Sequence, residues 1–353
     1  MKSIDCDCQF ASIRSWTNNV GDDIQNLAAE RFMPTIDVLA PKDRLSQFKP
    51  RRRMKLIMNG WWTYRPRRLV PGANVDPLLI SMHFCQGCQK EVGKGRIRDF
   101  LLRHGPVGCR DEATRKFLEG VGIPAYFSGC LTLTLQRNPA IEPNGYVVCV
   151  GLNDDLYNIV KNRTSRKTMS IQRYVPMLYS HETRMDIAKS FLALYQGAHC
   201  VVTRMLHVAL PCLALGTPCL FVDLNPARPE NQMSRFEGLS DLLNHVSVFD
   251  FLNGKFDFDF DSPPPSIGGP KFGMLRDGLV RRCSEFTGYD RNESMLSITD
   301  PLPFFLEVLS KPEYYAADSW RILYPNSVWK MPLRRIAAAL WNRCIRGWDT
   351  FDL

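Results

Sequence analysis

Short apolar runs alternate with helical patterns from residue 10 to about residue 250 of this 353-residue chain. Alternation of this kind predicts parallel sheets whose two faces are both covered by helices. The expected fold class is therefore α/β, with Rossmann-like sheets. The predicted strands span residues 10–16, 55–58, 79–84, 107–109, 125–127, 147–151, 200–202, 219–222 and 247–249, and the predicted helices span residues 24–32, 111–120, 186–196 and 208–215.

Two stretches rich in proline divide the chain. "NPAIEPNG" at residues 138–145 predicts an inter-domain linker, and "SPPPSIGGP" at residues 262–270 predicts a second break. We expect one Rossmann-like domain over residues 1–140, a second over residues 141–260, and a linker with a helical C-terminal segment over residues 261–353. The two domains should face a cleft, because ligands of parallel sheets gather at the carboxyl ends of the strands.

The net charge of +9 indicates an anionic partner, which a phosphorylated substrate, a membrane surface or nucleic acid would all satisfy. The 12 cysteines are scattered through apolar segments, and the N-terminus lacks the apolar core of a signal peptide. We therefore expect the protein to reside in the reducing cytoplasm, with its cysteines as free thiols. Cys85 and Cys88 have the spacing of a metal knuckle without a well-spaced second pair, and we expect no metal. No apolar run reaches the roughly 20 residues that span a bilayer.

Polar residues cluster where the first predicted strand ends, in "WTNNVGDDIQNLAAERF" at residues 16–32. Gly21 permits a tight turn, and Asp22 or Asp23 can cap the helix that follows. Bare N–H groups at such a helix start can hold an anion or a sugar hydroxyl. Two adjacent aspartates beside Asn19 are more than a cap needs, and they predict a site.

A second group of candidates lies at the ends of the next two strands. Asn59 and the Trp61–Trp62 pair follow one strand, and His83 lies near the end of the other. These residues could line a sugar site, because aromatic faces stack on the apolar faces of sugars. The alternative for either tryptophan is a place in the core.

Arginines also stand at strand ends. Arg110 precedes Asp111, which is well placed to cap the next helix, and a positive charge there opposes the helix dipole. An anionic ligand would compensate for that position, and a solvated surface position is the alternative. Arg228 and Arg235 follow the strand predicted at residues 219–222. Either could hold a phosphate or be an ordinary surface residue.

The turn "TRMLH" places Arg204 and His207 between a strand and the helix "VALPCLALG", which is apolar all round and therefore buried. Pro211 is expected in the first turn of that helix, where a missing N–H does little harm. A buried helix holds its first residues rigidly, which suits a preorganised site. We therefore predict a functional role for His207.

These residues carry a resemblance to the polysaccharide pyruvyl transferase family over roughly residues 10–290. The matching stretches are "NVGDDIQNLAA", "CRDEATRKFLEGVGIPAYFSGCLTLTL" and "VVTRMLHVALPCLALGTPCLFV". The resemblance implies a fold similar to the GT-B glycosyltransferases, with the acceptor on the first domain and the donor on the second. The family usually reads Arg-Leu-His, whereas Met205 stands here two positions before His207 and Arg204 three positions before it.

The implied reaction moves an enolpyruvyl group from phosphoenolpyruvate to two hydroxyls of a sugar, in an exopolysaccharide or cell-surface glycan precursor, and forms a pyruvate ketal. Arginine suits this donor because its fork binds carboxylate or phosphate through two bonds. His207 would transfer a proton, since its ordinary pKa is near neutrality. No cofactor or metal is required. The catalytic candidates are His207, Arg110, Asp22 and Asp23, and the substrate-binding candidates are Arg204, Arg228, Arg235, Asn19, Gly21, Asn59 and His83.

The tail from residue 331 carries an apolar helical stripe bordered by arginines. This segment could dock on the protein body. Alternatively, it could lie on the anionic inner face of the cell membrane, where lipid-linked acceptors are assembled. Two rival functions remain at this stage: a GT-B nucleotide-sugar glycosyltransferase and a non-catalytic protein that binds an anion or nucleic acid. Because the basic residues are dispersed and no nucleic-acid module is visible, we expect no nucleic-acid partner.

Overall fold

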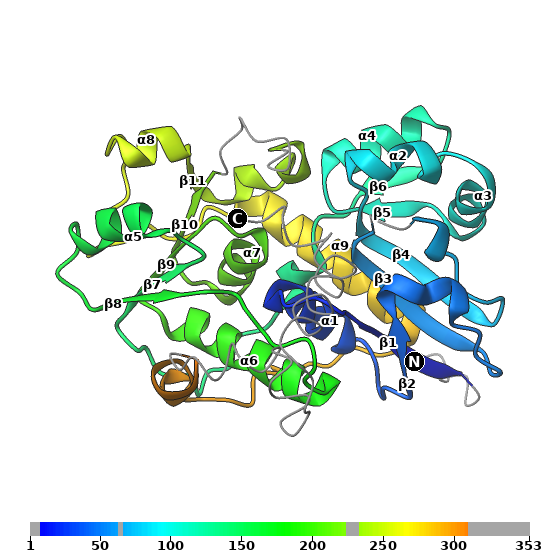
Figure 1. Ribbon diagram of the computed structural model, residues 1–353, viewed down its shortest axis with the longest axis horizontal. Helices are drawn as coiled ribbons and strands as arrows, with labels where there is room; N and C mark the ends of the chain where they lie inside the picture. The colour runs from blue at the N-terminus through cyan, green and yellow to red at the C-terminus, as the bar shows by residue number, and fades with distance from the viewer. Residues whose placement is uncertain (1–7, 63–65, 224–232, 310–353) are drawn as a thin grey trace, which may run out of the picture.

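The computed structural model describes residues 8–62, 66–223 and 233–309 (Figure 1). This part of the chain forms two sheets, and every paired strand in both sheets is parallel to its neighbour. Apolar side chains fill both faces of each sheet. The predicted α/β class with two parallel sheets is confirmed, whereas the tail from residue 331 lies outside the described residues.

The first sheet has the strand order β2-β1-β3-β4-β5-β6. Helix α1 (Val20–Glu30) packs on its inner face, and α2 (Gln86–Val92), α3 (Gly95–His104) and α4 (Glu112–Gly120) pack on its outer face. Successive side chains of a strand point to opposite faces, so Leu56 and Met58 join the outer core and Ile57 the inner one. The strands are β1 (Gln9–Arg14), β2 (Val38–Pro41), β3 (Met54–Trp61), β4 (Val75–His83), β5 (Val107–Cys109) and β6 (Ala125–Phe127).

The second sheet has the strand order β11-β10-β9-β7-β8. Helices α5 (Asp154–Lys161) and α8 (Val248–Leu252) contribute to its outer core, and α6 (His181–Gly197) and α7 (Leu206–Leu215) fill the inner face. The same alternation holds here, because Val201 belongs to the inner core and Val202 to the outer one. The strands are β7 (Val147–Val150), β8 (Thr168–Ile171), β9 (Cys200–Thr203), β10 (Cys219–Val222) and β11 (Asn244–Val246).

The inner faces of both sheets share one apolar core. Helix α1 packs against α6 and α7, so the two halves are joined through buried side chains. Helix α9 (Gly269–Thr287) runs back between the halves (Figure 1), and after it Asp290 forms an ion pair with Arg31 at 2.6 Å. This shared core fixes residues of the two sheets relative to each other, which matters for a site built from both.

Local sequence predicted most strands but misplaced the last. Residues 247–249 are not a strand: β11 ends at Val246, and Ser247 caps α8 by accepting a hydrogen bond from the Asp250 N–H at 3.0 Å. A serine followed three residues later by an acid is a helix-start signal that outweighs the apolar pattern. Strands β2 and β8 were not predicted. Of the helices in the described residues, none is both long and apolar enough to cross a membrane.

Candidate active site between the two sheets

A pocket opens between the two halves at the C-terminal ends of their strands. Trp61 ends β3, Arg110 directly follows β5, and Arg204 directly follows β9. This edge is where ligands of parallel sheets bind, as the sequence predicts. Of the predicted site residues, the pocket brings together Asn19, Gly21, Asp22, Arg110, Arg204, His207 and Arg235.

Asn19, and not an aspartate, caps the start of α1. The Asn19 Oδ1 accepts a hydrogen bond from the Gly21 N–H at 2.9 Å, and the Asn19 carbonyl accepts one from the Asp22 N–H at 3.1 Å. The Val20 N–H donates to the Arg173 carbonyl at 2.9 Å. The predicted aspartate cap is therefore wrong, because the helix begins at Val20, before both aspartates. The first N–H groups of α1 are used within the protein and are not bare.

His207 lies at a kink in the first turn of α7. Its φ of −82° and ψ of 18° are not helical. Pro211, four residues later, has no N–H to donate to the His207 carbonyl, so the usual helical restraint on His207 is missing. Since α7 begins at Leu206, Pro211 lies beyond the first turn where it was predicted.

Gly21 lets α1 approach the start of α7 closely. A Cβ atom at Gly21 would lie 3.0 Å from the His207 Cβ and 3.0 Å from the Asn19 Oδ1. Those distances are shorter than ordinary carbon contacts, so a larger residue would push the two helices apart. Glycine at this position places His207 beside the first turn of α1.

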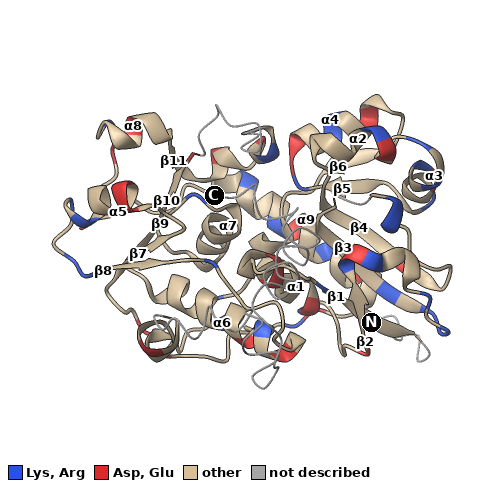
Figure 2. Ribbon diagram, in the orientation of Figure 1, with Lys and Arg blue, Asp and Glu red and all other residues tan. Residues whose placement is uncertain are grey.

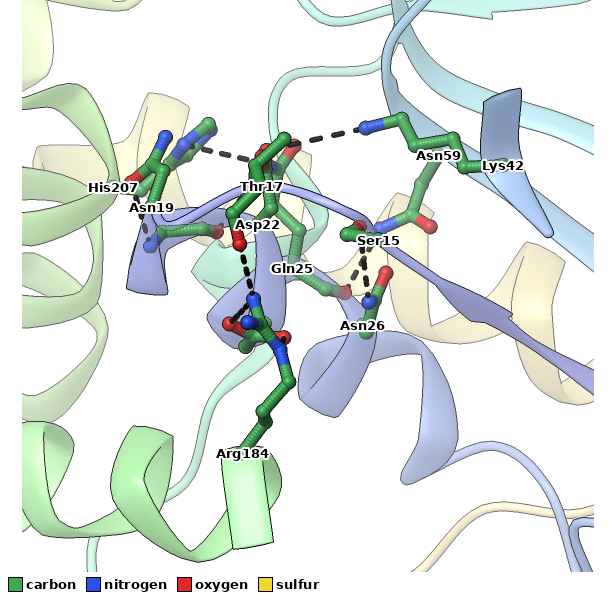
Figure 3. Close-up of polar contacts among 12 residues, drawn as sticks. Ser15, Thr17, Asn19, Asp22, Gln25, Asn26, Lys42, Asn59, Arg184 and His207 are labelled. Carbon is green, nitrogen blue, oxygen red and sulfur yellow. Dashed lines mark hydrogen bonds and ion pairs between the residues drawn. The ribbon is translucent and has the colours of Figure 1, made fainter. Parts of the chain in front are cut away.

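Gln25 links His207 to Asp22 (Figure 3). The Gln25 Nε2 lies 3.3 Å from the His207 Nδ1 and 3.3 Å from the Asp22 Oδ1. An amide nitrogen can only donate, so the Nδ1 accepts and the neutral ring carries its proton on Nε2. The Nε2 atom is enclosed and has no hydrogen-bond partner among the described residues. His207 therefore offers an unpartnered N–H at the pocket.

The Asp22 carboxylate is held from several sides. The Thr17 Oγ1 donates to its Oδ2 at 2.7 Å, and the Lys42 Nζ lies 3.9 Å from its Oδ1 (Figure 3). Among the pocket-lining residues of the described chain, Asp22 is the only acid. It faces a lining that also holds four arginines, so the pocket is strongly positive.

The surroundings of His207 disfavour its charged form. Burial lowers the pKa of His207 well below the ordinary value of 6.5, and the positive charges of Arg110, Lys42 and the nearby arginines lower it further. The ring is consequently neutral near pH 7 in the protein alone. An anion bound among the arginines would cancel part of their effect and raise the pKa of His207.

Arg110 is a buried cation beside the pocket. Its side chain is 2% exposed, and its Nε has no hydrogen-bond partner among the described residues, with the Asp111 Oδ2 3.6 Å away. Asp111 caps α4 at the Thr114 N–H and lies 2.6 Å from the His83 Nδ1. The ion pair of Arg110 with Asp111 is long and shared with His83, and it leaves the Arg110 Nε without a hydrogen bond, which favours an anionic ligand.

The remaining arginines come from three different segments: Arg235 from a short 3-10 helix (Met233–Phe236), and Arg173 and Arg204 from the turns after β8 and β9. Arg235 lies over the Trp61 ring at 5.5 Å, and Trp61 lines the pocket while Trp62 belongs to the core. Arg204 lies in the turn between β9 and α7. Arg173, which no sequence pattern indicated, follows β8. Lys and Arg positions are spread over both halves (Figure 2), so the positive pocket is a local convergence of arginines.

Met205 lines the pocket beside the arginines, and its side chain also packs on Gly151. A Cβ atom at Gly151 would lie 3.0 Å from the Met205 Cε, so glycine at that position makes room for the methionine side chain. The Met205 N–H donates to the Thr203 Oγ1 at 3.0 Å. This turn chemistry fixes the start of α7, where no side chain forms a cap hydrogen bond.

Three of the predicted site residues that the structure describes do not line the pocket. Asp23 forms a buried ion pair with Arg184, at 3.0 Å to Nε and 2.7 Å to Nη2. The Asn59 Nδ2 donates to the Gln25 carbonyl at 2.9 Å, and so supports α1 from below the site. His83 is held by Asp111, and burial and Arg110 lower its pKa to about 4. Arg228 lies outside the described residues.

Within the described residues, no cluster of three or more His, Cys, Asp or Glu side chains could hold a metal ion. The ten cysteines described are free thiols. Cys88 donates its S–H to the Cys85 carbonyl at 3.0 Å, so the pair with knuckle spacing is hydrogen-bonded locally.

Comparison with known proteins identifies one sequence family. Residues 19–226, more than half of the chain, match the polysaccharide pyruvyl transferase family. No curated protein gives a significant match.

The solved structures with weak similarity to the chain include two proteins. One is an uncharacterized protein from Klebsiella pneumoniae subsp. pneumoniae, with 14% identity, a TM-score of 0.39, and coverage of 70% of this chain and 95% of that one. The other is the heptosyltransferase WaaC of E. coli with ADP, with 11% identity, a TM-score of 0.22, and coverage of 79% and 99%.

Proposed function

This chain belongs to the polysaccharide pyruvyl transferase family, and from that premise we propose that it transfers an enolpyruvyl group from phosphoenolpyruvate to two hydroxyls of one sugar. The product is a cyclic pyruvate ketal on an exopolysaccharide or cell-surface glycan precursor. We further propose that the reaction occurs in the cytoplasm, on an acceptor that is free or lipid-linked.

One observation carries this proposal. Among the described residues, four guanidinium groups and a histidine with an unpartnered Nε2 converge on one pocket, and its described lining holds a single acid. Phosphoenolpyruvate concentrates close to three negative charges in a small volume, and arginine forks suit both its carboxylate and its phosphate. The excess of positive lining charge, four arginines against Asp22, matches the charge of this donor.

Donor binding would also prepare the acid. In the protein alone, burial and neighbouring cations hold the pKa of His207 low. The bound donor offsets those cations, so His207 takes up a proton and becomes an imidazolium whose Nε2–H points at the pocket. The proton is then transferred to C3 of the enol, which makes C2 cationic.

The acceptor reacts at C2. One sugar hydroxyl forms a bond to C2 and releases its proton to the Asp22 carboxylate, which Thr17 and Lys42 hold in place. The bond from C2 to the phosphate oxygen breaks, and the phosphate leaves with the electron pair. The second hydroxyl then bonds to C2, closes the ketal and gives its proton to the departing phosphate. The first hydroxyl's proton leaves Asp22 for solvent, which balances the proton that His207 took up and delivered to C3.

Calorimetric titration of the purified protein with phosphoenolpyruvate, beside uridine diphosphate, tests the proposal. We expect saturable binding of phosphoenolpyruvate that Arg204→Ala weakens, and no competition from the nucleotide. With a diol sugar acceptor, His207→Ala should abolish phosphate release while leaving the fold intact. Binding of the nucleotide alone would reject the pyruvyl donor in favour of glycosyl transfer.

A further inference from the structure

Arg173 reaches the pocket from the outer edge of the second sheet. It follows β8, which is the edge strand of that sheet, and it lines the same pocket as Arg110 and His207. Its positive charge contributes to the lowered pKa of His207. A residue after an edge strand would ordinarily lie at the surface, so its position here needs a cause.

That cause is a short backbone connection between the two halves. The Val20 N–H donates to the Arg173 carbonyl at 2.9 Å, and the Val175 N–H donates to the Asn18 carbonyl at 2.8 Å. Between these bonds, Asn19 and Tyr174 form an antiparallel bridge. The segment 173–175 is thereby attached to the residues that start α1, and Arg173 is delivered to the pocket by main-chain bonds that do not depend on its side chain.

The two halves contribute different groups to the pocket. The first half supplies the Asp22 carboxylate and Arg110, whereas the second half supplies Arg173 and Arg204, and Arg204 lies just before α7. No side chain forms a cap hydrogen bond at the start of this ten-residue helix. The first turn of α7 is kinked at His207, and the Val208 N–H already donates to the Met205 carbonyl at 3.1 Å. The anion site is therefore marked by Arg110, a 2% exposed guanidinium whose Nε has no hydrogen-bond partner among the described residues.

We propose that Arg173 binds the phosphate group of the donor, beside the start of α7, and remains bound to it as it leaves. This role rests on the proposed function. When the bond from C2 to the phosphate oxygen breaks, the electron pair goes to the phosphate, and a guanidinium in contact with that oxygen neutralises the added charge. Arg110 is left for the carboxylate at the side of Asp22.

The test compares Arg173→Met with Arg166→Met, which removes an exposed arginine just before β8. Calorimetry with phosphoenolpyruvate should show a dissociation constant raised about 10- to 100-fold in Arg173→Met and unchanged in Arg166→Met, because a charge-assisted hydrogen bond contributes about 1.5–3 kcal/mol. Inorganic phosphate and pyruvate, titrated separately, identify the group bound. We expect Arg173→Met to weaken phosphate binding and to leave pyruvate binding unchanged.

Two controls separate this role from a structural one. Arg173→Met without ligand should still unfold in a single cooperative transition, since the backbone connection is kept, and Arg173→Lys should recover part of the affinity. If wild type binds phosphoenolpyruvate and Arg173→Met binds it equally well, this role is refuted and the proposed function stands. If wild type itself fails to bind phosphoenolpyruvate, both are refuted together.

Discussion

Gln25 lies with its Nε2 3.3 Å from the His207 Nδ1, so a residue in the second turn of α1 determines which ring nitrogen of His207 faces the pocket. The two side chains come from different halves and are 182 positions apart in the chain. The contact couples the orientation of His207, the proposed proton donor, to the packing of α1 on α7. It also connects His207 to Asp22, since the same amide nitrogen of Gln25 is 3.3 Å from the Asp22 Oδ1.

Gln25→Met should therefore impair chemistry and spare donor binding. The substitution keeps the volume of the side chain but removes the donor that holds the Nδ1, so the ring can turn or change tautomer. We expect kcat to fall about 10- to 100-fold, part of what general acid catalysis usually contributes. The dissociation constant for phosphoenolpyruvate should not change, because Gln25 does not line the pocket. Gln47→Met, at an exposed position, is the matched control; a raised dissociation constant with normal kcat would contradict the assignment.

Gly21→Ala tests the close approach of α1 to α7. The added Cβ would meet the His207 Cβ at 3.0 Å and must displace it. Overpacking of this kind costs about 1–3 kcal/mol of unfolding free energy, and we expect turnover to fall more than stability suggests, because the displaced residue is the acid. Urea unfolding and turnover would be measured together. Gly87→Ala in α2, where nothing lies within 4 Å of the new Cβ, should be neutral or slightly stabilising.

The sequence located the pocket better than it assigned the residues in it. Strand ends are visible as apolar runs that stop at polar residues, so Arg110, Arg204 and His207 could be predicted from local pattern alone. Arg173 could not, because its place depends on backbone bonds between segments 18–20 and 173–175, which no local periodicity encodes. Adjacent residues of a helix point about 100° apart, and only the position of Arg184 reveals that Asp22, and not Asp23, faces the pocket.

Donor binding should be coupled to proton uptake. The pKa of His207 is lowered well below 6.5 in the protein alone, so its ring is neutral at pH 7 and gains a proton when an anion offsets the nearby arginines. Titration with phosphoenolpyruvate in two buffers of different ionisation enthalpy measures that uptake. We expect net proton uptake on donor binding, of at most one proton per donor, and an affinity that decreases as pH rises.

The contribution of His207 to this uptake is isolated by variants. His207→Ala should remove the uptake and flatten the dependence of affinity on pH. His245→Ala, at a half-exposed histidine paired with Asp223, should leave both unchanged. An uptake that persists in His207→Ala would assign the proton to another group and remove the acid role from His207.

The Asp23–Arg184 pair should stabilise the fold without entering the chemistry. Both side chains are 1% exposed, and Arg184 also donates to the Thr17 and Pro176 carbonyls, so the pair holds α1 and the loop before it against α6. Burial raises the pKa of Asp23 to about 7 although Arg184 opposes the rise, which means that desolvation of this carboxylate is expensive. Removing one partner leaves the other charge buried and unpaired.

A double-mutant cycle measures this dependence. Asp23→Ala and Arg184→Met should each lower the free energy of unfolding by about 3–5 kcal/mol, and the double variant should lose much less than the sum. The solvent-accessible pair of Asp186, which is exposed, and Lys189, which is partly buried, in α6 is the control, and its single variants should change stability by no more than about 1 kcal/mol. Folded Asp23→Ala protein should keep its affinity for phosphoenolpyruvate, because Asp23 points away from the pocket. If that affinity is lost while the fold is retained, Asp23 belongs to the site, and the division of roles between the two aspartates must be reversed.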